Sequence, residues 1–348
     1  MLSVAISAQS LKHPVEVSKR YSARFSHSGS TSGSGQSSAV ASPDIGDIGN
    51  MAARPFLKWA GGKRQLLPEI LSRLPPSFAR YHEPFVGGGA VFFALHERGL
   101  LGPKRARLAD INADLVNAYQ VVRDRVETLI VLLGQFRNEE DFYYEVRAQE
   151  THTLDPVQRA ARLLYLNKTC FNGLFRENRQ GRFNVPFGHY SDPQFLKPND
   201  LRAASRALRG VAIEQSTFDE LESQAQPGDL VYCDPPYAPV SRTASFTSYS
   251  AGGFDDSAQA RLTAMVQRLG NRGVNVLLSN SSVPLTHELY RNLHVEQVYA
   301  SRAINSRGDR RGKVPELLVA AGPLATQLAA RSLALPMSAP SPVALTAV

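Results

Sequence analysis

Cysteine is scarce in this chain, and long apolar runs are missing. Only Cys170 and Cys233 occur among the 348 residues, too few for a disulfide framework or a zinc cluster, so we expect a reducing compartment and no metal site. No apolar run approaches the roughly 18 residues that span a bilayer. No heptad pattern or apolar stripe calls for a second chain. These absences predict a soluble, cytoplasmic monomer without a membrane or an obligate protein partner.

Acidic residues are outnumbered by basic ones, 31 to 39, which leaves a formal net charge of +8. An excess of this size permits a polyanionic partner but does not identify one. Its distribution says more, because residues 159–190 carry six Lys or Arg side chains against Glu177, and residues 291–313 carry six against two acids. Two basic stretches of this kind are typical of a groove for nucleic-acid phosphates, although a solvated basic surface is the alternative for each.

Aromatic residues are rare at both ends of the chain. Residues 1–52 are rich in serine and glycine, and residues 323–348 in alanine, proline and serine. Such segments bury too little apolar surface to fold, so both are predicted to be disordered. The N-terminal segment loosely resembles an organelle transit peptide, but we interpret it as a dispensable extension, with Met51 as an alternative start.

An apolar run that ends in a carboxylate, two prolines and an aromatic ring occupies residues 229–237, DLVYCDPPY. Proline cannot continue a strand, so Asp234 and Tyr237 are expected on a stiff loop at the carboxyl end of a buried strand, where open α/β sheets bind ligands. Asp234 and the Pro235 carbonyl can accept both hydrogens of an exocyclic amine while Tyr237 stacks on its ring. These contacts localise the nitrogen lone pair and make an aromatic amine a better nucleophile. For the tetrapeptide alone, an ordinary Asp-Pro turn is an equal alternative.

A glycine-rich turn lies within residues 81–90, YHEPFVGGGA, and precedes an apolar helical run. Strand, glycine turn and helix in this order begin a nucleotide-binding unit, in which Gly87 and Gly89 let the backbone approach a ligand. About twenty residues further on, Asp110 ends a second predicted strand, where an acid is positioned for ribose hydroxyls. The short glycine run suits an adenosyl ligand without phosphates. A dinucleotide oxidoreductase is the alternative, but it leaves residues 234–237 without a role.

Two further regions combine aromatic and basic residues. Residues 56–64, FLKWAGGKR, place Lys63 near a helix start, where anions are favoured, and contain Trp59, whose alternative role is a core anchor. Residues 166–176, LNKTCFNGLFR, and 182–188, RFNVPFG, interleave aromatics, amides and arginines with turn residues. Such side chains stack on bases, read base edges and hold phosphates, although a loop packed on its own aromatics is equally compatible.

The rest of the chain alternates helical and strand patterns. Residues 113–150 are predicted to be helical, and residues 238–254, rich in Ser, Thr and Gly, to form a mobile loop over the site. Further strands are expected at residues 211–215, 273–280, 294–303 and 314–320.

Five segments in a fixed order resemble the adenine-specific DNA methyltransferases of the DNA adenine methylase type. They are residues 56–63, 85–89, 109–112, the aromatic and basic stretch, and 234–237. The resemblance covers roughly residues 55–320 and implies an α/β fold, with the Rossmann-like, doubly wound sheet of S-adenosylmethionine-dependent methyltransferases. It also implies that residues 53–112 and 208–322 form the catalytic domain and residues 113–207 a largely helical insert that recognises the DNA target.

The resemblance implies transfer of the methyl group of S-adenosylmethionine to the N6 amine of an adenine flipped out of double-stranded DNA. Transfer is a direct in-line displacement, without a metal or a covalent enzyme intermediate. Catalysis is assigned to Asp234, Pro235, Pro236 and Tyr237. The cofactor is assigned to Trp59, Lys63, Phe85, Gly87, Gly89, Asp110 and Asp234.

In this family the recognition stretch reads GATC. The residues that the resemblance places at the DNA are Lys58, Phe171, Asn172, Leu174, Arg176, Pro186 and His189. Phe171, the expected stacking wedge, stands where the family more often has tyrosine, and His189 where it more often has arginine or lysine. A weaker DNA contact at His189 is therefore a hypothesis, and the flanking preferences stay open.

Several alternatives share part of this pattern. A related enzyme with the same donor could act on the N4 amine of cytosine or on RNA, although Asp234 favours adenine. A protein-glutamine methyltransferase would share the pocket, but its motif usually begins with asparagine and needs no basic stretch. A DNA-binding protein that has lost catalysis is the alternative from another class, and the intact Asp110, Lys63 and Tyr237 argue against it. The sequence leaves open whether a restriction enzyme accompanies the protein.

Overall fold

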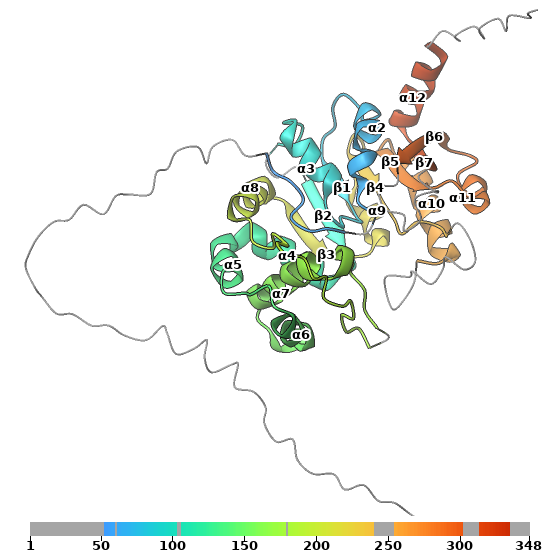
Figure 1. The fold of residues 1–348 in the computed structure, drawn as a ribbon. Helices are drawn as coiled ribbons and strands as arrows, with labels where there is room; N and C mark the ends of the chain where they lie inside the picture. The colour runs from blue at the N-terminus through green and yellow to red at the C-terminus, as the bar shows by residue number, and fades with distance from the viewer. Residues whose placement is uncertain are drawn as a thin grey trace, which may run out of the picture. The chain divides into compact units, whose positions relative to one another are not determined.

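A seven-stranded sheet forms the centre of the protein, with strand order β3-β2-β1-β4-β5-β7-β6 (Figure 1). The strands are β1 Tyr81–Glu83, β2 Ala106–Asp110, β3 Ala212–Gln215, β4 Leu230–Cys233, β5 Asn275–Ser281, β6 His294–Ser301 and β7 Lys313–Ala321. The strands from β3 to β5 pair in parallel, and β7 runs antiparallel to both of its neighbours. This arrangement confirms the predicted α/β class and the predicted strands.

The computed structural model describes residues 52–59, 61–102, 106–178, 180–239, 254–301 and 313–334. Most of the predicted N-terminal extension, the greater part of the predicted loop over residues 238–254 and the basic loop over residues 302–312 lie outside these ranges. One compact unit contains all of the described residues.

The order of the strands reverses between β1 and β4. These two strands are neighbours in the sheet, with Tyr81 opposite Leu230 and His82 opposite Val231. Because parallel strands end at the same edge, the glycine turn after β1 and the Asp-Pro-Pro-Tyr loop after β4 emerge side by side. The predicted ligand edge is therefore a topological switch point, the usual binding place in open α/β sheets.

Both faces of the sheet are buried, because successive strand residues point to opposite sides. In β4, Leu230 and Tyr232 pack into one core with the helices that precede β3, while Val231 and Cys233 pack into a second core with α10. A strand buried on both faces needs an uninterrupted apolar sequence. This requirement explains why the DLVYC run predicts a strand.

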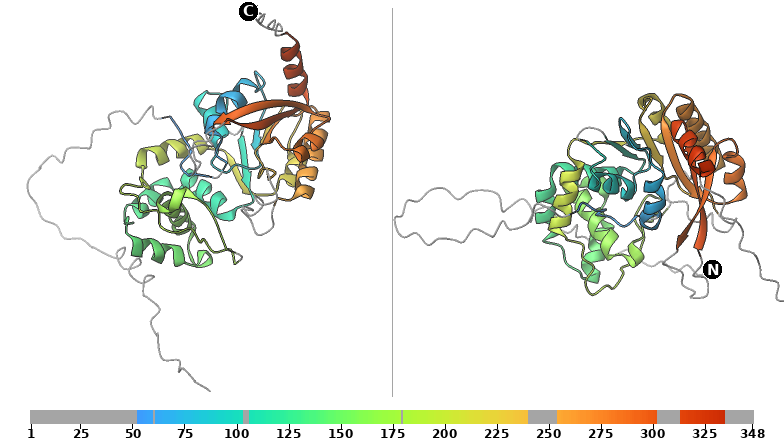
Figure 2. Two further views of the ribbon diagram at one scale, coloured as in Figure 1. Left: turned by 45° about the vertical axis from the view of Figure 1, so that its right-hand side comes forward. Right: turned by 90° about the horizontal axis from the view of Figure 1, so that it is seen from above.

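The helices are α2 Leu67–Ser72, α3 Ala90–Glu97, α4 Ala113–Asp124, α5 Val126–Leu133, α6 Glu140–Ala148, α7 Pro156–Thr169, α8 Pro198–Leu208, α9 Leu221–Gln224, α10 Asp256–Asn271, α11 Pro284–Leu289 and α12 Pro323–Ala334. Short 3-10 turns are η2 Lys63–Gln65, η3 Thr151–Thr153, η4 Phe171–Gly173 and η5 Phe218–Glu220. Helices α5, α6 and α7 lie toward the β3 edge and the β6–β7 pair forms the opposite edge (Figure 2).

Local sequence signals set the helix starts. The Asn112 side chain accepts a hydrogen bond from the Leu115 amide at the start of α4. Asp155 and Gln158 form a capping box at the start of α7, with Pro156 in its first turn. These caps satisfy amide groups that the helix itself leaves without partners.

The segment predicted as a DNA-recognition insert, residues 113–207, is largely helical but shares its core with the sheet. Helix α4 packs on β2 and β3 and also on α7. The same hydrophobic cluster contains Leu108 of β2 and Leu164 of α7. The start of the predicted insert is therefore also a supporting helix of the sheet.

The prediction of disorder is wrong for the first part of the C-terminal tail. Residues 323–334 form helix α12, which packs on β5 and β7, whereas residues 335–348 lie outside the described ranges. The alanine-rich composition indicates disorder, but alanine also has the highest helix propensity. Leu324 and Leu328, one helical turn apart, are both buried, and Pro323 is in the first helical position, where proline is tolerated.

Candidate active site

Asp234 is the first residue after β4, and two neighbours orient its carboxylate. Its Oδ1 atom lies 2.7 Å from the Lys63 ammonium and accepts a hydrogen bond of 3.0 Å from Ser279 of β5. The Ser279 hydroxyl in turn lies 3.0 Å from the hydroxyl of Tyr232. The described residues form no hydrogen bond to the other carboxylate oxygen, Oδ2, or to the carbonyl oxygen of Pro235. Within the described ranges, these two acceptor atoms therefore have no hydrogen-bond partner in the protein.

The loop that carries these acceptors is tied to β5 and α10. The Ala238 amide donates to Asn280 Oδ1 over 3.2 Å, and the Ser281 hydroxyl donates to the Ala238 carbonyl over 2.7 Å. Gln259 of α10 donates to the Pro236 carbonyl over 2.9 Å. Gln259 was not predicted from the sequence, because one polar residue within an amphipathic helix is not a distinctive signal. These bonds hold the loop rigidly.

Burial and charge act in opposite directions on Asp234. Burial raises the pKa of the Asp234 carboxyl, and the neighbouring Lys63 ammonium limits that rise. The Lys63 nitrogen also lies 2.8 Å from the Gly61 carbonyl oxygen and 4.4 Å from the centre of the Tyr237 ring. Lys63, predicted to hold the cofactor, therefore lies directly against the first and last residues of the tetrapeptide that is predicted to be catalytic.

The glycine turn after β1 is shaped by side chains as well as by backbone freedom. Gly87 and Gly89 have φ values of +46° and +68°, which favour glycine. A Cβ atom on Gly87 would lie 2.9 Å from the Trp59 ring, and one on Gly89 would lie 2.6 Å from the Tyr119 hydroxyl. The Gly87 amide donates to Asp110 Oδ2 over 3.1 Å. The turn therefore joins the predicted cofactor residues Trp59 and Asp110 in one cluster.

Aromatic and aliphatic side chains lie beside this cluster. The Phe85 ring stacks on Phe218 at a centroid distance of 5.7 Å, and Phe254 meets both rings edge-on. Ile111, next to Asp110, leaves 63% of its side chain exposed at the same edge of the sheet. Phe218 and Ile111 were not among the residues predicted for the site. A lone phenylalanine in a polar turn and an isoleucine after a strand are usually core residues.

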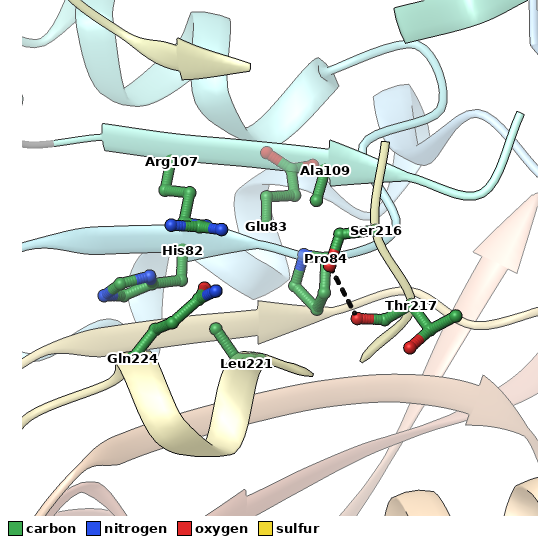
Figure 3. Close-up of a pocket in the computed structure, with 9 residues that line it drawn as sticks. All are labelled: His82, Glu83, Pro84, Arg107, Ala109, Ser216, Thr217, Leu221 and Gln224. Atoms are coloured by element: carbon green, nitrogen blue, oxygen red, sulfur yellow. Dashed lines mark hydrogen bonds between the residues drawn. The ribbon is translucent and has the colours of Figure 1, made fainter. Parts of the chain in front are cut away.

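A small cavity lies behind the glycine turn, between β1, β2 and α9 (Figure 3). It is lined by His82, Glu83, Pro84, Arg107, Ala109, Ser216, Thr217, Leu221 and Gln224, and the Glu83 carboxylate points away from the His82 side of β1. Glu83 is buried, accepts a hydrogen bond of 2.8 Å from the Tyr81 hydroxyl, and has a pKa that burial raises to about 8. No member of the Asp-Pro-Pro-Tyr tetrapeptide lines this cavity, so it is separate from the acceptor pair.

The predicted recognition residues lie on a short two-stranded ribbon that follows α7. Bridges join Cys170 to Phe187 and Glu177 to Phe183, and the Phe171 amide donates to the Pro186 carbonyl. One set of side chains faces inward and is buried: Phe175, Phe183, Val185 and Phe187. The exposed set is Phe171, Asn172, Leu174, Arg176, Pro186 and His189. The ribbon therefore packs on its own aromatics and still presents nearly all of the predicted DNA residues to solvent.

The base of the ribbon, beside the Cys170–Phe187 bridge, has two non-glycine residues with a left-handed backbone. Asn172 has a φ of +56°, and its amide donates a hydrogen bond of 2.9 Å to the Tyr190 hydroxyl. His189 has a φ of +51°, and its Nδ1 atom lies 4.0 Å from Glu140. Phe171, half exposed, lies next to Asn172 at this base. An exposed phenylalanine held on a rigid turn is suitable for insertion between bases.

Asn167, at the end of α7, connects the ribbon to the Lys58–Trp59 segment. Its amide group accepts a 2.8 Å hydrogen bond from the Lys58 backbone amide and donates a 2.7 Å bond to the Lys58 carbonyl. The Trp59 ring also stacks on Phe175 at 5.0 Å. The predicted DNA residue Lys58 and the predicted cofactor residue Trp59 are thus both fixed to the recognition ribbon.

Part of the basic stretch over residues 159–190 is not free for phosphate contacts. Arg162 is buried and donates to the carbonyls of Val146 and Arg147, where it caps the end of α6. Arg159 pairs with Asp114, and Arg182 lies 2.8 Å from Glu150. The groove predicted from this stretch is therefore smaller than its charge count indicates.

Lys168 lies close to Lys58, one of the predicted DNA residues. Burial and the nearby ammonium groups of Lys58 and Lys197 lower its pKa to about 8. Arg302, Arg307, Arg310 and Arg311 of the second basic stretch lie outside the described residues.

Both cysteines are buried and unpaired. Burial raises the pKa of the Cys170 thiol to about 11, and it also raises that of Cys233, so both thiols act as small core residues. Within the described ranges, no group of His, Cys, Asp and Glu side chains could hold a metal ion. None of the described helices combines the length and the apolar character needed to cross a membrane.

Known proteins resemble this chain over most of its length. Residues 59–304 match the family of D12 class N6 adenine-specific DNA methyltransferases. The chain is 40% identical over 288 residues to the type II methyltransferase M.MjaIII of Methanocaldococcus jannaschii, covering 77% of this chain and 99% of that protein. It is 39% identical over 274 residues to the type II methyltransferase M1.LlaDCHI of Lactococcus lactis subsp. cremoris, covering 76% and 94%. It is also 39% identical over 269 residues to the DNA adenine methylase of Escherichia coli K12, covering 76% and 94%. The family match and the shared length lead to one conclusion: the chain belongs to the D12 class of N6 adenine-specific DNA methyltransferases.

Proposed function

We propose that this protein transfers the methyl group of S-adenosylmethionine to the N6 amine of an adenine that is flipped out of double-stranded DNA, with GATC as the target. The observation that carries the proposal is the pair of available acceptors, Asp234 Oδ2 and the Pro235 carbonyl, on a loop held at the switch point of the sheet. An adenine amine offers two hydrogens, so this pair matches it in number and chemical type.

The tetrapeptide then does three things to the base. Asp234 and Pro235 accept the amine hydrogens, which concentrates electron density on N6. Tyr237 stacks on the adenine ring and keeps it in place. Pro236, which has no amide hydrogen and a restricted φ, keeps the loop stiff. Lys63 and Ser279 orient the carboxylate through Oδ1 and leave Oδ2 to the base.

S-adenosylmethionine, when bound, supplies an electrophilic methyl group for direct displacement. The residues proposed to hold it are Trp59, Lys63, Phe85, Gly87, Gly89, Asp110 and Asp234. Their chemistry fits this ligand. The Asp110 carboxylate at the end of β2 can accept hydrogen bonds from ribose hydroxyls, and the exposed Ile111 next to it offers an apolar surface for a purine. Phe85, which stacks on Phe218, adds an aromatic surface to this set of residues.

DNA recognition is assigned to the exposed face of the ribbon. Phe171 is the proposed stacking wedge, and Arg176 and Asn172 are proposed to read base edges or to hold the backbone. The remaining proposed contacts are Lys58, Leu174, Pro186 and His189. The Arg176 guanidinium donates to Asn184 Oδ1 over 2.7 Å, which holds it along the exposed face of the ribbon. The resemblance of this ribbon to the DNA adenine methylase family supports GATC.

The test is transfer of a labelled methyl group from S-adenosylmethionine to two DNA duplexes, one with GATC and one in which only its A·T pairs are replaced. Label in the first duplex alone is expected. Label in both would keep the methyltransferase and reject GATC. Base analysis of the product separates N6-methyladenine from N4-methylcytosine, and a matched RNA duplex tests RNA as the acceptor.

A catalytically silent DNA-binding protein is the remaining alternative from another class. It would bind the GATC duplex without incorporating label. Donor binding distinguishes the cases further, because a silent binder has no need of S-adenosylmethionine. Calorimetric titration of the full chain with S-adenosylhomocysteine, the product, is expected to show one site per chain.

A further inference from the structure

A glutamate from a distant strand contacts the tyrosine of the catalytic tetrapeptide. The Tyr237 hydroxyl donates a hydrogen bond of 2.6 Å to Oε2 of Glu316, which lies in β7. Strand β7 lies between β5 and β6 with Glu316 opposite Ser281, at the end of β5 that also anchors the Asp-Pro-Pro-Tyr loop. The contact therefore joins the antiparallel part of the sheet to the proposed base-stacking ring.

This contact fixes one end of the ring, and Lys63 fixes its face. A phenol that donates to a carboxylate forms a short, charge-assisted bond, stronger than one between neutral groups. Burial, Asp234 and Glu316 raise the pKa of the Tyr237 phenol, which keeps its proton and stays a donor. The Lys63 ammonium lies 4.4 Å from the ring centre. Rotation of the ring about its side-chain bonds is restricted by these two contacts together.

We propose that Glu316 is a positioning residue, which holds the Tyr237 ring in the orientation that stacks on the flipped adenine. The inference rests on the proposed function, since it assumes that Tyr237 stacks on the base. A ring fixed before the base arrives loses less conformational entropy on stacking and keeps the amine aligned with its two acceptors. The strand pattern of residues 314–320 contains no signal for this role, because Glu316 looks there like an ordinary polar strand residue.

A second role for Glu316 would be purely electrostatic. Its carboxylate is one of the charges that raise the pKa of Asp234, so its loss could change activity without any change at the Tyr237 ring. The two roles differ in one respect. Only the positioning role requires the Tyr237 hydroxyl, so removal of that hydroxyl separates them.

The experiment is a double-mutant cycle on the full chain, with Glu316→Ala, Tyr237→Phe and the double variant. Rates of single-turnover methyl transfer to the GATC duplex are measured at saturating S-adenosylmethionine. Glu316→Ala is expected to slow transfer on the order of tenfold, the scale of one hydrogen bond to a charged group. Steady-state rates at varied S-adenosylmethionine are expected to show little change in the KM for the cofactor. In the Tyr237→Phe background the same substitution is expected to have no further effect.

The conservative variant Glu316→Gln retains an acceptor oxygen, so it is expected to restore most of the rate. The position of the Tyr237 ring is followed by the fluorescence of 2-aminopurine placed at the target adenine. The fluorescence is expected to be brighter with Glu316→Ala, because a loosely held Tyr237 ring quenches the 2-aminopurine less. Thermal melting checks that each variant folds. If Glu316→Ala does not fold, Glu316→Leu, which fills the strand position without an acceptor, goes through the same cycle.

Two results would overturn the inference: an unchanged rate for Glu316→Ala, or an equal loss of rate in the Tyr237→Phe background. Tyr237→Ala separates this failure from failure of the proposed function. If Tyr237→Ala loses activity while the Glu316 cycle shows no coupling, only the positioning role is wrong. If Tyr237→Ala remains fully active, the proposed role of the tyrosine is wrong, and the inference falls with it.

Discussion

The Lys63 ammonium lies 2.7 Å from Oδ1 of Asp234, although one residue precedes β1 and the other follows β4. The parallel pairing of those two strands brings the segments together. A carboxylate in this position would be costly to bury without a partner. The pair therefore explains how a largely buried carboxylate is stabilised at this position.

The acid limb of the activity profile is expected to depend on Lys63. Asp234 is the stronger acceptor when ionised, because protonation turns one carboxylate oxygen into a donor. Burial raises its pKa above the usual value, so activity is expected to fall as the pH drops through that raised value. Lys63→Met removes the charge that opposes burial, which should move the acid limb to higher pH. Single-turnover rates from acidic to neutral pH at saturating cofactor and DNA measure this shift. Lys63→Arg, which retains the charge, is the matched control, and an acid limb in the same place for Lys63→Met would contradict the prediction.

Asp234→Ala is expected to lower the rate of methyl transfer by at least about a hundredfold, the usual effect of losing a key transition-state acceptor. DNA binding should largely persist, because the recognition ribbon lies on a separate segment. Single-turnover kinetics and DNA-binding titrations give the two quantities separately. Near-normal turnover would refute the acceptor mechanism.

Phe171→Ala should weaken base flipping at the target. Phe171 is half exposed at the base of the ribbon, and loss of one stacking side chain typically costs about 1–3 kcal/mol. A drop of roughly tenfold in affinity for the GATC duplex is expected, together with a smaller rise in 2-aminopurine fluorescence when the duplex is bound. Phe171→Tyr keeps the ring and serves as the control. Equal flipping by the alanine variant would assign the wedge to another side chain.

His189→Arg should strengthen DNA binding by on the order of threefold, because a permanent charge replaces an exposed imidazole beside the ribbon. The logarithmic salt dependence should also steepen by about one added phosphate contact. Titrations at several salt concentrations test both effects, with His189→Gln as a neutral control. An arginine variant with the affinity and salt slope of the parent would remove His189 from the DNA contact set.

Glu83 is expected to make the free protein less stable as the pH rises from about 5 to about 8. Its pKa is about 8 in the folded protein against 4.5 as the reference value. Between these values the folded state keeps a proton that the unfolded state releases, so the free energy of unfolding falls as pH increases, by at most about 1.4 kcal/mol per pH unit.

Glu83→Gln cannot ionise, so its stability relative to the parent protein should increase over the same pH range. Urea unfolding at several pH values without cofactor or DNA measures the difference. The exposed Glu97 provides a matched glutamine substitution as the control. A difference between Glu83→Gln and the parent that stays constant with pH would contradict the raised pKa.

The sequence by itself was sufficient to predict the sheet strands and the family. Strands buried on both faces require continuous apolar runs, so the runs over residues 229–233 and 273–280 predict their strands directly. The segments that resemble the family are short and local, because turns and loop motifs depend on neighbouring residues. The roles assigned to these residues in catalysis and binding stay predictions until they are measured.

Other features depended on contacts between distant segments. Nothing in the local sequence of Glu316 connects it with Tyr237, and nothing around Arg162 distinguishes a buried helix cap from a phosphate ligand. Helix α12 forms where composition indicates disorder, because Leu324 and Leu328 find a surface on the sheet. The sequence by itself thus determined the strands, the turns and the chemical groups. Only the tertiary structure decided which charges and rings meet, because those contacts depend on how the strands pair and how the helices pack over the sheet.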